Sequence, residues 1–391
     1  MDLAHSIKTQ ARALGFDLVA ITSVGPSPDW ERYRAWLEAG RAGEMDFLMR
    51  HLPLKRDPRT LLPDARSMIL VGLNYAAHLD PELLENPARG RISMYALGSD
   101  YHKIMRKALI RLDRWLAQRT GRSTQGRIFV DSAPVLERSW ANRGGLGFIG
   151  KNTCLIHPRM GSYFFLGGLL VPEALPPDPT PRLETAWRTF QKDVVWRFED
   201  GQIGTCGACT RCLKRCPTHA LVGPRELDAR LCIAYLTIEH RGVIPATIRP
   251  QMGNWVFGCD ICQDVCPWNR KRHIAQHPKL QPHPDRIAPP LLELLALDED
   301  AFRQRFAGSP VMRAKWMGFM RNVCIAAGNW GDPEALEGLA HHLWHSPPLI
   351  AIHAAWALAQ LRHEAGVPVL EQAAKSTKKP HLREIIAQAR R

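Results

Sequence analysis

Apolar positions near the N-terminus follow first a helical and then a strand period. Leucine, isoleucine and alanine recur at helical spacing from Leu3 to Leu14, Gly15 ends the helix, and Phe16 to Ile21 is typical of a strand. A second continuous apolar run, Ser67 to Tyr75, predicts a buried strand. The beginning of the chain therefore predicts an α/β domain.

The segments between and after these strands have helix and loop patterns. Trp30 to Met49 is mostly helical in pattern, whereas Pro53 to Pro63 is a proline-punctuated loop. Arg91 to Tyr101 also reads as a loop, and it leads into a long basic helix predicted from Lys103 to Gln118.

Asp131 ends a short predicted strand that begins at Arg127. Ser132 suits the N-cap of a following helix, and Pro134 suits its first turn. The carboxyl end of a strand is also the edge at which open α/β sheets bind ligands. Two roles therefore stay open for Asp131, a helix-capping residue and a site residue.

The middle of the chain is more irregular. Gly144 to Thr153 is rich in glycine but lacks the spacing of the nucleotide-binding loops. Thr153 to His157 and Ser162 to Val171 predict a hairpin. After the proline-rich Pro172 to Pro181, we expect Arg182 to Gln202 to form an inserted polar helix.

From Leu291 onward the pattern is helical. Asn322 to Asn329 aligns with His353 to Gln360 at a period of 31 residues, and a second apolar helix follows each. Two HEAT-like helical hairpins fit this repeat, and so does a plain helical cap.

Eight of the ten cysteines lie between Cys206 and Pro267. They stand in the strings CGACTRCLKRCP and CDICQDVCP, with Cys232 alone between them. Such runs, closed by a proline, are typical of two-cluster ferredoxins, in which the fourth cysteine of a run ligates the other 4Fe–4S cluster. This rule assigns Cys206, Cys209, Cys212 and Cys266 to one cluster, and Cys216, Cys232, Cys259 and Cys262 to the other.

Zinc and disulfides are the alternatives for these cysteines. A structural zinc site needs only four ligands, and disulfides are disfavoured where so many cysteines lie two residues apart. The two remaining cysteines, Cys154 and Cys324, are expected to be free thiols buried as small apolar side chains.

The 391 residues suffice for two or three domains. The chain lacks an apolar run of the ~20 residues that a membrane span needs, and it lacks a signal-like start, so we expect a cytoplasmic protein without membrane contact. Its 52 Lys and Arg outnumber 38 Asp and Glu, a net charge of +14 that favours a polyanionic partner. The basic residues gather at Lys103 to Arg127, at Arg270 to Arg272 and in the tail after Lys375.

Several long strings carry more than a pattern. They are YALGSDYHK (Tyr95 to Lys103), VDSAPVLER (Val130 to Arg138), GLGFIGKNT (Gly145 to Thr153), GSYFFLGGLLV (Gly161 to Val171), CIAYLTIEHRG (Cys232 to Gly242) and MGNWVFGCDICQDVCPWNR (Met252 to Arg270). Together with the cysteine groups they resemble the epoxyqueuosine reductase family, the iron–sulfur and cobalamin enzymes of queuosine modification in tRNA.

The resemblance implies an α+β multidomain chain. Residues 1–180 would form a nitroreductase-like α/β cobalamin-binding domain, residues 181–290 a ferredoxin-like domain with two 4Fe–4S clusters, and residues 291–391 C-terminal all-α HEAT-like repeats.

The resemblance also implies roles for individual residues. Asp131 matches the family's proton donor, and Met94 stands where arginine or cysteine is expected. The positions that match the cobalamin-binding site are Arg56, Met94, Asp131, Leu155, Leu166, Glu239 and the backbone of Gly258. Arg241 matches a tRNA contact, and the basic Arg270, Lys271 and Arg272 are expected to bind tRNA phosphates.

The implied reaction is the reduction of epoxyqueuosine to queuosine at the anticodon wobble position, with electrons relayed through two 4Fe–4S clusters to cobalamin. Epoxide removal also needs a proton, and for Asp131 to hold it near neutral pH we expect an apolar setting that raises its pKa. Asp100 and His102 form a DxH, but Met105 replaces the glycine of the corrinoid-binding DxHxxG, so histidine is not expected to ligate cobalt.

The expected partners are the tRNA anticodon stem-loop and an external electron donor such as flavodoxin or ferredoxin, and the chain is expected to be a monomer. One alternative is a corrinoid iron–sulfur reductase of a small molecule, like the reductive dehalogenases, although such an enzyme has no use for a charge of +14. Another is a non-catalytic electron carrier, which leaves the long segment before the cysteines without a role.

Overall fold

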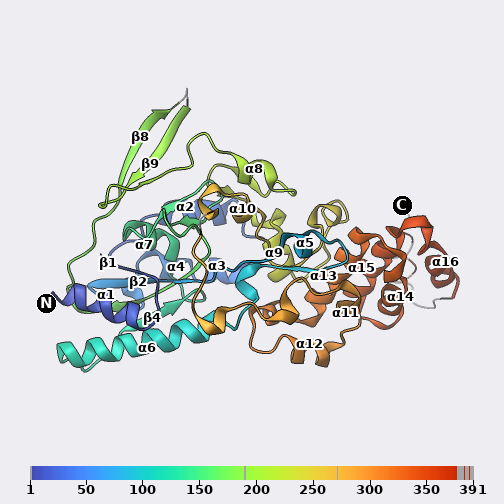
Figure 1. Ribbon diagram of the computed structural model, residues 1–391, viewed down its shortest axis with the longest axis horizontal. Helices are drawn as coiled ribbons and strands as arrows, with labels where there is room; N and C mark the ends of the chain where they lie inside the picture. The colour runs from blue at the N-terminus through green and yellow to red at the C-terminus, as the bar shows by residue number, and fades with distance from the viewer. Residues whose placement is uncertain (1, 189–190, 271, 377–382, 384–386, 388–391) are drawn as a thin grey trace.

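The computed structural model of the chain describes residues 2–188, 191–270, 272–376, 383 and 387. In Figure 1 the N-terminal α/β part (blue and cyan) lies at one end of the molecule, and the C-terminal helices (orange and red) lie at the other. The fold is mixed α/β with a helical C-terminal region, as the sequence predicts. The domain boundaries near residues 180 and 290 stay a prediction.

A four-stranded antiparallel sheet organises the N-terminal part. Its strand order is β1 (Leu18–Ser23), β2 (Ser67–Asn74), β7 (Phe164–Val171), β4 (Arg127–Val130). All residues of β2 are buried, as its apolar run predicts, because helices cover both faces of the sheet. Asp131 directly follows the last residue of β4, as predicted, but the sheet is antiparallel, so the rule for the ligand-binding edge of open α/β sheets does not explain its position.

Three helices cover this sheet. α1 (Leu3–Ala13) and α6 (Tyr101–Thr120) pack on one face, and α7 (Glu137–Arg143) packs on the other. The expected cap of α7 is wrong, because the helix begins three residues after Pro134 and no side chain caps it. Ser132 Oγ instead lies 3.4 Å from the carbonyl of Val130. Residues 131–136 are therefore a loop, and Asp131 does not cap a helix.

The N-terminal part also contains four short helices. They are α2 (Trp30–Glu38), α3 (Asp46–Arg50), α4 (Leu52–Arg56) and α5 (Pro81–Glu85). α4 and a 3₁₀ turn at Pro58–Thr60 occupy most of the stretch expected to be a proline-rich loop, since proline fits the first positions of both.

The inserted helix expected at Arg182 to Gln202 is wrong. β8 (Arg182–Arg188), β9 (Gln191–Arg197) and β10 (Ile203–Gly204) form a three-stranded antiparallel sheet that projects from the body in Figure 1. The strand signal is the alternation of Val194, Trp196 and Phe198, which a helical reading overlooks.

The hairpin expected from Thr153 to Val171 is also wrong for most of its length. β6 (Leu155–Ile156) pairs with β5 (Phe148–Ile149), and β7 joins the central sheet. A single antiparallel bridge between His157 and Gly161 joins the two runs.

The segment with the cysteine groups consists of short elements. They are α8 (Arg211–Arg215), β11 (Leu221–Gly223), β12 (Glu226–Leu227), α9 (Ile233–Ile238), β13 (Trp255–Phe257) and α10 (Ile261–Asp264). β13 pairs in parallel with β3 (Arg91–Ile92), so this segment shares a sheet with the N-terminal part.

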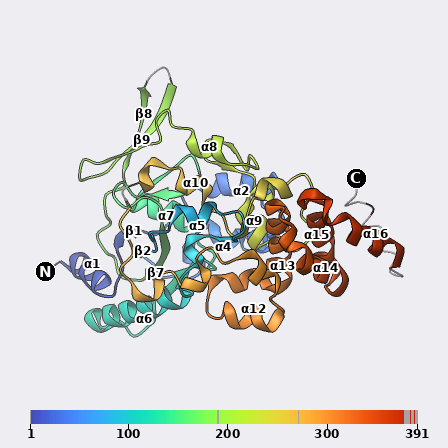
Figure 2. The same ribbon diagram turned by 45° about the vertical axis from the view of Figure 1, so that its right-hand side comes forward.

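The C-terminal helices are α11 (Leu291–Leu295), α12 (Glu299–Arg305), α13 (Lys315–Trp330), α14 (Leu336–His345), α15 (Pro348–Ala359) and α16 (Val367–Ser376). α13 with α14 and α15 with α16 are the two helix pairs of the predicted repeat, and they lie side by side in Figure 2. Gly328 permits close packing of α13 on α15, because a Cβ there would lie 2.8 Å from Ala357 Cα.

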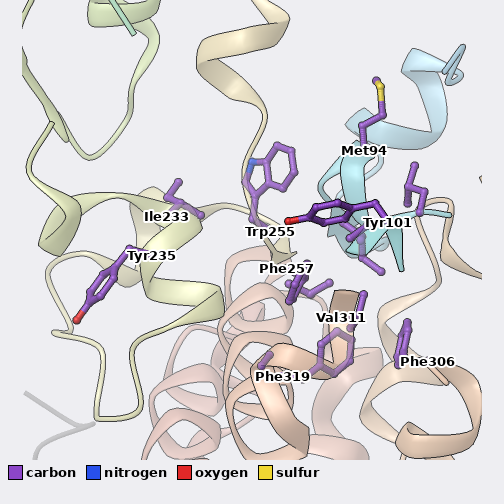
Figure 3. Packing of buried hydrophobic residues seen from close by; sticks show 14 of the residues in the cluster. Met94, Tyr101, Ile233, Tyr235, Trp255, Phe257, Phe306, Val311 and Phe319 are labelled. Carbon is purple, nitrogen blue, oxygen red and sulfur yellow. The ribbon is translucent and has the colours of Figure 1, made fainter. Parts of the chain in front are cut away.

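The main hydrophobic core is continuous from the sheet through the cysteine segment to the C-terminal helices. Figure 3 shows Phe257 of β13 near Phe319 of α13, with Tyr101 and Met94 beyond them. In the part of the chain that the structure describes, we find no helix with both the length and the apolar character of a membrane span.

Arg321 and Asn322 of α13 join the helices to the cysteine segment. The fully buried guanidinium of Arg321 donates to the carbonyls of Leu236, His240 and Gly242. Asn322 Nδ2 donates to the carbonyls of Thr237 (2.9 Å) and Val256 (3.0 Å). The two side chains thus satisfy carbonyl groups at and beyond the end of α9.

We expect Arg321→Met to destabilise the protein by about 3–5 kcal/mol, because it leaves buried carbonyls without donors. The thermal unfolding midpoint should fall by several degrees, measured by calorimetry. Arg303→Met on the exposed side of α12 is the control and should leave the midpoint unchanged, since its ion pair with Glu299 is solvent-exposed. Equal midpoints for the two variants would contradict the role of Arg321.

Candidate functional site

The structure brings the eight cysteines of the segment into two groups. Cys206, Cys209, Cys212 and Cys266 line one cavity of about 260 Å³, together with Lys151, Trp268 and neighbouring residues. These are the four cysteines that the ferredoxin rule assigns to one cluster. A cavity of this size between four sulfur atoms suits a cluster better than a single ion.

The other four cysteines, Cys216, Cys232, Cys259 and Cys262, form the second group and are each partly buried. Burial raises the pKa of Cys232 and of Cys259, and the neighbouring thiols, Cys216 among them, raise it further. Cys262 belongs to the same group, because the thiols of Cys259 and Cys232 also act on it. Since a thiol in such a place resists ionisation, it needs the positive charge of a metal to become a thiolate ligand.

The loop from Gly150 to Leu155 contacts both groups. Lys151 N donates to Cys206 Sγ (3.3 Å), and Asn152 Nδ2 donates to the carbonyl of Cys262 (3.2 Å). Cys154, expected to be an isolated thiol, forms a hydrogen bond with Cys262 that lowers its own pKa. Sequence reasoning missed this function of the loop, although polar Lys151 and Asn152 in a glycine-rich stretch were a signal.

Asp260 ties the cysteine segment to the N-terminal part. It is buried between two cluster cysteines in sequence, and its carboxylate accepts from the Ser93 hydroxyl and from Met94 N (2.6 Å). Burial raises the pKa of Asp260 to about 6. Met94, an expected cofactor contact, is itself buried, and its sulfur accepts from the amide of Ala77 (3.3 Å).

Asp131 faces α6 across a polar contact. Its Oδ2 accepts from the Tyr101 hydroxyl (3.0 Å) and lies 3.2 Å from His102 Nε2. The protein around Asp131 raises its pKa by partial desolvation, although much of the side chain is exposed, but the hydrogen bond and charge of His102 outweigh this effect and the pKa lies below its usual value. The expected apolar setting with a raised pKa is therefore wrong.

Aromatic rings surround this contact. The Tyr101 ring stacks on His102 (4.1 Å between centroids) and on Phe165 of β7 (3.8 Å). Tyr95, in the 3₁₀ turn η2 (Met94–Ala96), lies 6.4 Å from Tyr101 and 6.0 Å from Phe257. Asp131 keeps 64% of its side chain exposed beside these rings, so it borders open space.

Lys55, which is buried, and Glu137, which is partly buried, lie close enough to Asp131 for its charge to act on both. Lys55 of α4 lies with its Nζ 5.3 Å from the centre of the Tyr33 ring, and burial lowers its pKa. Burial, followed by the charge of Asp131, raises the pKa of Glu137 to about 8. Glu137 Oε1 and the Tyr33 hydroxyl are buried without a hydrogen-bond partner among the described residues.

Glu239 and two arginines lie where the C-terminal helices meet the site. Arg313 of the 3₁₀ turn η8 (Pro310–Ala314) makes two contacts of 3.0 Å with the Glu239 carboxylate. Arg241 donates to the carbonyls of Arg313 (3.0 Å) and Ala314 (3.1 Å). The side chain of Arg241, which was expected to contact RNA, is therefore hydrogen-bonded to backbone carbonyls of the C-terminal helical part.

The other residues expected at the cofactor site differ in how deeply they are buried. Leu155 is buried, and Leu166 is partly buried on β7. Gly258 has a φ of +69°, its amide donates to Thr237 Oγ1, and a Cβ there would lie 2.4 Å from Ser93 Cβ. Arg56 is exposed.

Of the basic residues predicted to bind phosphates after α10, one is exposed and one makes contacts within the protein. Arg270 is exposed, and Lys271 lies outside the described residues. Arg272 lies over the Tyr163 ring at 5.3 Å and donates to the carbonyls of Asn269 and Ala77. Its guanidinium thus has a structural role in this position.

Three regions of the sequence match known families. Residues 55–132 match the family described as "Epoxyqueuosine reductase QueG, DUF1730", residues 205–269 match the 4Fe–4S double cluster binding domain, and residues 319–390 match HEAT repeats.

Curated relatives match nearly the whole chain. It is 40% identical over 360 residues to the epoxyqueuosine reductase of Shigella dysenteriae, covering 92% of this chain and 89% of that protein. For the Escherichia coli K12 enzyme the identity is 39% with the same coverage. For the Pseudomonas aeruginosa enzyme it is 40%, covering 91% of this chain and 94% of that protein.

Solved structures give the same result. An epoxyqueuosine reductase with an epoxyqueuosine-modified tRNA-Tyr stem loop matches with a TM-score of 0.86 and 27% identity, covering 99% of this chain and 98% of that one. The Bacillus subtilis enzyme, described with an aspartate's catalytic loop swung out of the active site, matches with a TM-score of 0.83 at 27% identity and the same coverage. A catabolic reductive dehalogenase matches with a TM-score of only 0.36, so its likeness to this chain is weak. The resemblance read from the sequence is confirmed.

We expect about eight iron and eight sulfide per chain, since two sets of four cysteines suit two 4Fe–4S clusters. Cys232→Ala should lower the iron content to about half, measured on anaerobically prepared protein, because one set loses a ligand. Cys324→Ala in α13 is the control and should keep all the iron. An unchanged iron content in Cys232→Ala would remove Cys232 from the ligand set.

Glu137→Gln should change how stability depends on pH. Because the pKa of Glu137 is raised in the folded protein, its contribution is present below its unfolded value of about 4.5 and is lost as the pH rises toward about 8. The variant should therefore unfold at a higher temperature than the unaltered protein at pH 8, by up to a few kcal/mol in free energy, and at a similar temperature at pH 5. Glu337→Gln on α14 should change neither value. Parallel pH dependences for Glu137→Gln and the unaltered protein would show that Glu137 stays ionised.

Proposed function

The chain belongs to the epoxyqueuosine reductase family, and from this we propose that it reduces epoxyqueuosine to queuosine at the wobble position of a tRNA anticodon. The observation that carries the proposal is the shared core. Two sets of four cysteines and the acid Asp131 lie in parts of the chain that pack against one another. Such an arrangement joins an electron path to a proton donor.

We assign Cys206, Cys209, Cys212 and Cys266 to the outer cluster, because they line an open cavity. Cys216, Cys232, Cys259 and Cys262 would hold the inner cluster, since these thiols act on one another and none of them lines the open cavity. An external one-electron carrier such as flavodoxin or ferredoxin would deliver electrons at the outer site. A monomer in a reducing, cytoplasmic compartment suits this arrangement.

When bound, cobalamin, the cofactor that the family resemblance implies, would supply the reducing chemistry for the epoxide. The residues beside Asp131 fit it, since partly buried Tyr95 and Leu166 offer apolar surface next to open space. We propose that Leu155 supports this surface from below, with the Gly258 backbone, Glu239 and Met94 at its edge. Arg56, on the surface of α4, would reach a peripheral group. His102 is engaged with Asp100 and Asp131, so it is not free to ligate cobalt.

We propose that Asp131 delivers the proton to the departing epoxide oxygen. The competing role as a helix cap has no support, because α7 begins at Glu137. Asp131 opens the loop 131–136 with a φ of +48°, a conformation that a short polar residue tolerates. In one solved relative, the catalytic loop that carries an aspartate is described as swung out of the active site. This description agrees with our proposal that the loop of Asp131 can move.

We infer that the RNA lies on the side of the C-terminal helices. Arg241 and Arg313 border the site, and a solved relative binds a tRNA stem loop. Arg270 adds an exposed positive charge. Arg272 is better explained by its packing on Tyr163 than by phosphate binding.

Asp131→Asn should abolish most turnover, by about a hundredfold or more, because proton delivery is lost. Iron content and the corrinoid spectrum should stay normal, and the product is followed by mass spectrometry of the wobble nucleoside in a synthetic stem-loop. Near-normal turnover would leave Asp131 without a catalytic role.

Replacing Arg241 and Arg270 together by Gln should weaken stem-loop binding and flatten its salt dependence by about one to two units of slope, since each phosphate contact contributes about 0.7–0.9. Binding is measured by fluorescence anisotropy over a range of salt concentrations. Arg303→Gln on α12 is the matched control. If the free nucleoside were reduced as efficiently as the stem-loop, without any salt effect, the small-molecule alternative would be favoured.

A further inference from the structure

His102 lies between two carboxylates. Its Nδ1 is 2.8 Å from Asp100 Oδ1, and its Nε2 is 3.2 Å from Asp131 Oδ2. A neutral imidazole has one N–H and can donate to only one of them, whereas an imidazolium donates to both. The geometry therefore favours the protonated ring.

The fold of α6 holds the ring in this place. Asp100 is the N-cap of the helix, and the same Oδ1 also accepts the backbone amide of His102 (3.1 Å). The imidazole stacks on the Tyr101 ring, which in turn stacks on Phe165 of the central sheet. A cap and a stack thus fix both the position and the tilt of His102.

We propose that His102 stores the proton that Asp131 delivers, and that Asp100 is a positioning residue that keeps the imidazole charged. The inference rests on the proposed role of Asp131. It answers a difficulty of that role, because an aspartate with a lowered pKa carries no proton of its own at neutral pH.

The proton transfers balance in two steps. When bound substrate excludes water above Asp131, a proton moves from His102 Nε2 to Asp131, and an ion pair becomes a neutral pair that low polarity favours. Asp131 then gives this proton to the oxygen as the first carbon–oxygen bond of the epoxide breaks, and it returns to the carboxylate. When the second carbon–oxygen bond breaks, the oxygen leaves as water with a second proton, which reaches Asp131 by the same path after His102 has been protonated again. The two electrons that the alkene product requires come from the external donor through the clusters. His102, whose side chain is 38% exposed, takes the next proton from water.

Other charged groups face this pair. Arg313 from η8 acts on Asp131 from the side of the helical part, and it lowers the pKa of Asp131 less than His102 does. Lys55 on α4 and Glu137 on α7 lie close enough to Asp131 for its charge to act on both. Among the described residues, none of these three forms a hydrogen bond with Asp131, whereas His102 does. The pKa of Tyr95, on η2, is raised by burial and also by the charge of Asp131.

The protonation of His102 can be measured directly by NMR titration of the imidazole signals in the full chain, assigned by their loss in His102→Gln. Burial lowers the pKa of His102, but its hydrogen bonds to Asp131 and Asp100 outweigh burial and raise it. The titration midpoint should therefore lie above the ordinary value of about 6.5 and should fall in Asp131→Asn and in Asp100→Asn. A midpoint that is the same in all three proteins would overturn the proposal.

Kinetics with the epoxyqueuosine stem-loop supplies the second test. His102→Gln keeps a hydrogen-bonding side chain but holds no proton, so kcat should fall at least about tenfold with KM unchanged. In Asp100→Asn, which caps the helix about as well, kcat should be near normal at low pH, and the alkaline limb of the pH profile should move to lower pH. His341→Gln on the exposed side of α14 is the control and should match the unaltered enzyme.

The two proposals fail in different ways. Full activity in Asp131→Asn would remove the acid role of Asp131 and the present inference with it. An inactive Asp131→Asn together with an unaltered kcat and pH profile in His102→Gln would leave Asp131 as the acid and overturn the role of His102 alone.

Discussion

The carbonyl groups at the end of α9 impose the constraint on which the rest of the site depends. A short helix leaves its last carbonyls without partners in the helix, and burying them unpaired is costly. Arg321 and Asn322 supply the missing donors from α13. Because Cys232 is the N-cap of α9 and Glu239 is its C-cap, the same contacts fix the position of Cys232 relative to Glu239. Helix α13 therefore helps to position the segment in which we propose that one cluster is held.

The chemistry around Asp131 rests on polar contacts where burial alone would have been simpler. An apolar pocket would keep an aspartate protonated, but it would also isolate that aspartate from any source of a second proton. Because Asp131 is paired with His102, its pKa is lowered and not raised. In exchange, Asp131 has a neighbour of the residue type that takes up and releases protons near neutral pH. The exposed edge of His102 then connects the site to water.

Features encoded by local spacing were predictable from the sequence, whereas those formed by distant contacts were not. Cysteine intervals predicted which four would line a common cavity, because the proline after Cys216 and the one after Cys266 constrain the chain locally. The helical repeat was legible for the same reason. The partner of Asp131 was not, since His102 lies on another element and only the sheet and α6 bring the two together. The strands β8 and β9 were misread because the alternation of Val194, Trp196 and Phe198 is short and follows a mostly polar stretch, so a helical period fits the segment as well.

The parallel pairing of β3 with β13 has a consequence for how the protein is made. It joins segments far apart in the chain, and contacts of this kind form slowly because a long loop must close first. Until they form, the thiols of Cys259 and Cys262 next to β13 are open to water and to oxidants that convert thiolates irreversibly. The time spent unfolded is thus a period of chemical vulnerability for the cysteine segment. Recovery of active enzyme from cells should depend on oxygen and iron supply during synthesis more than on the stability of the finished fold.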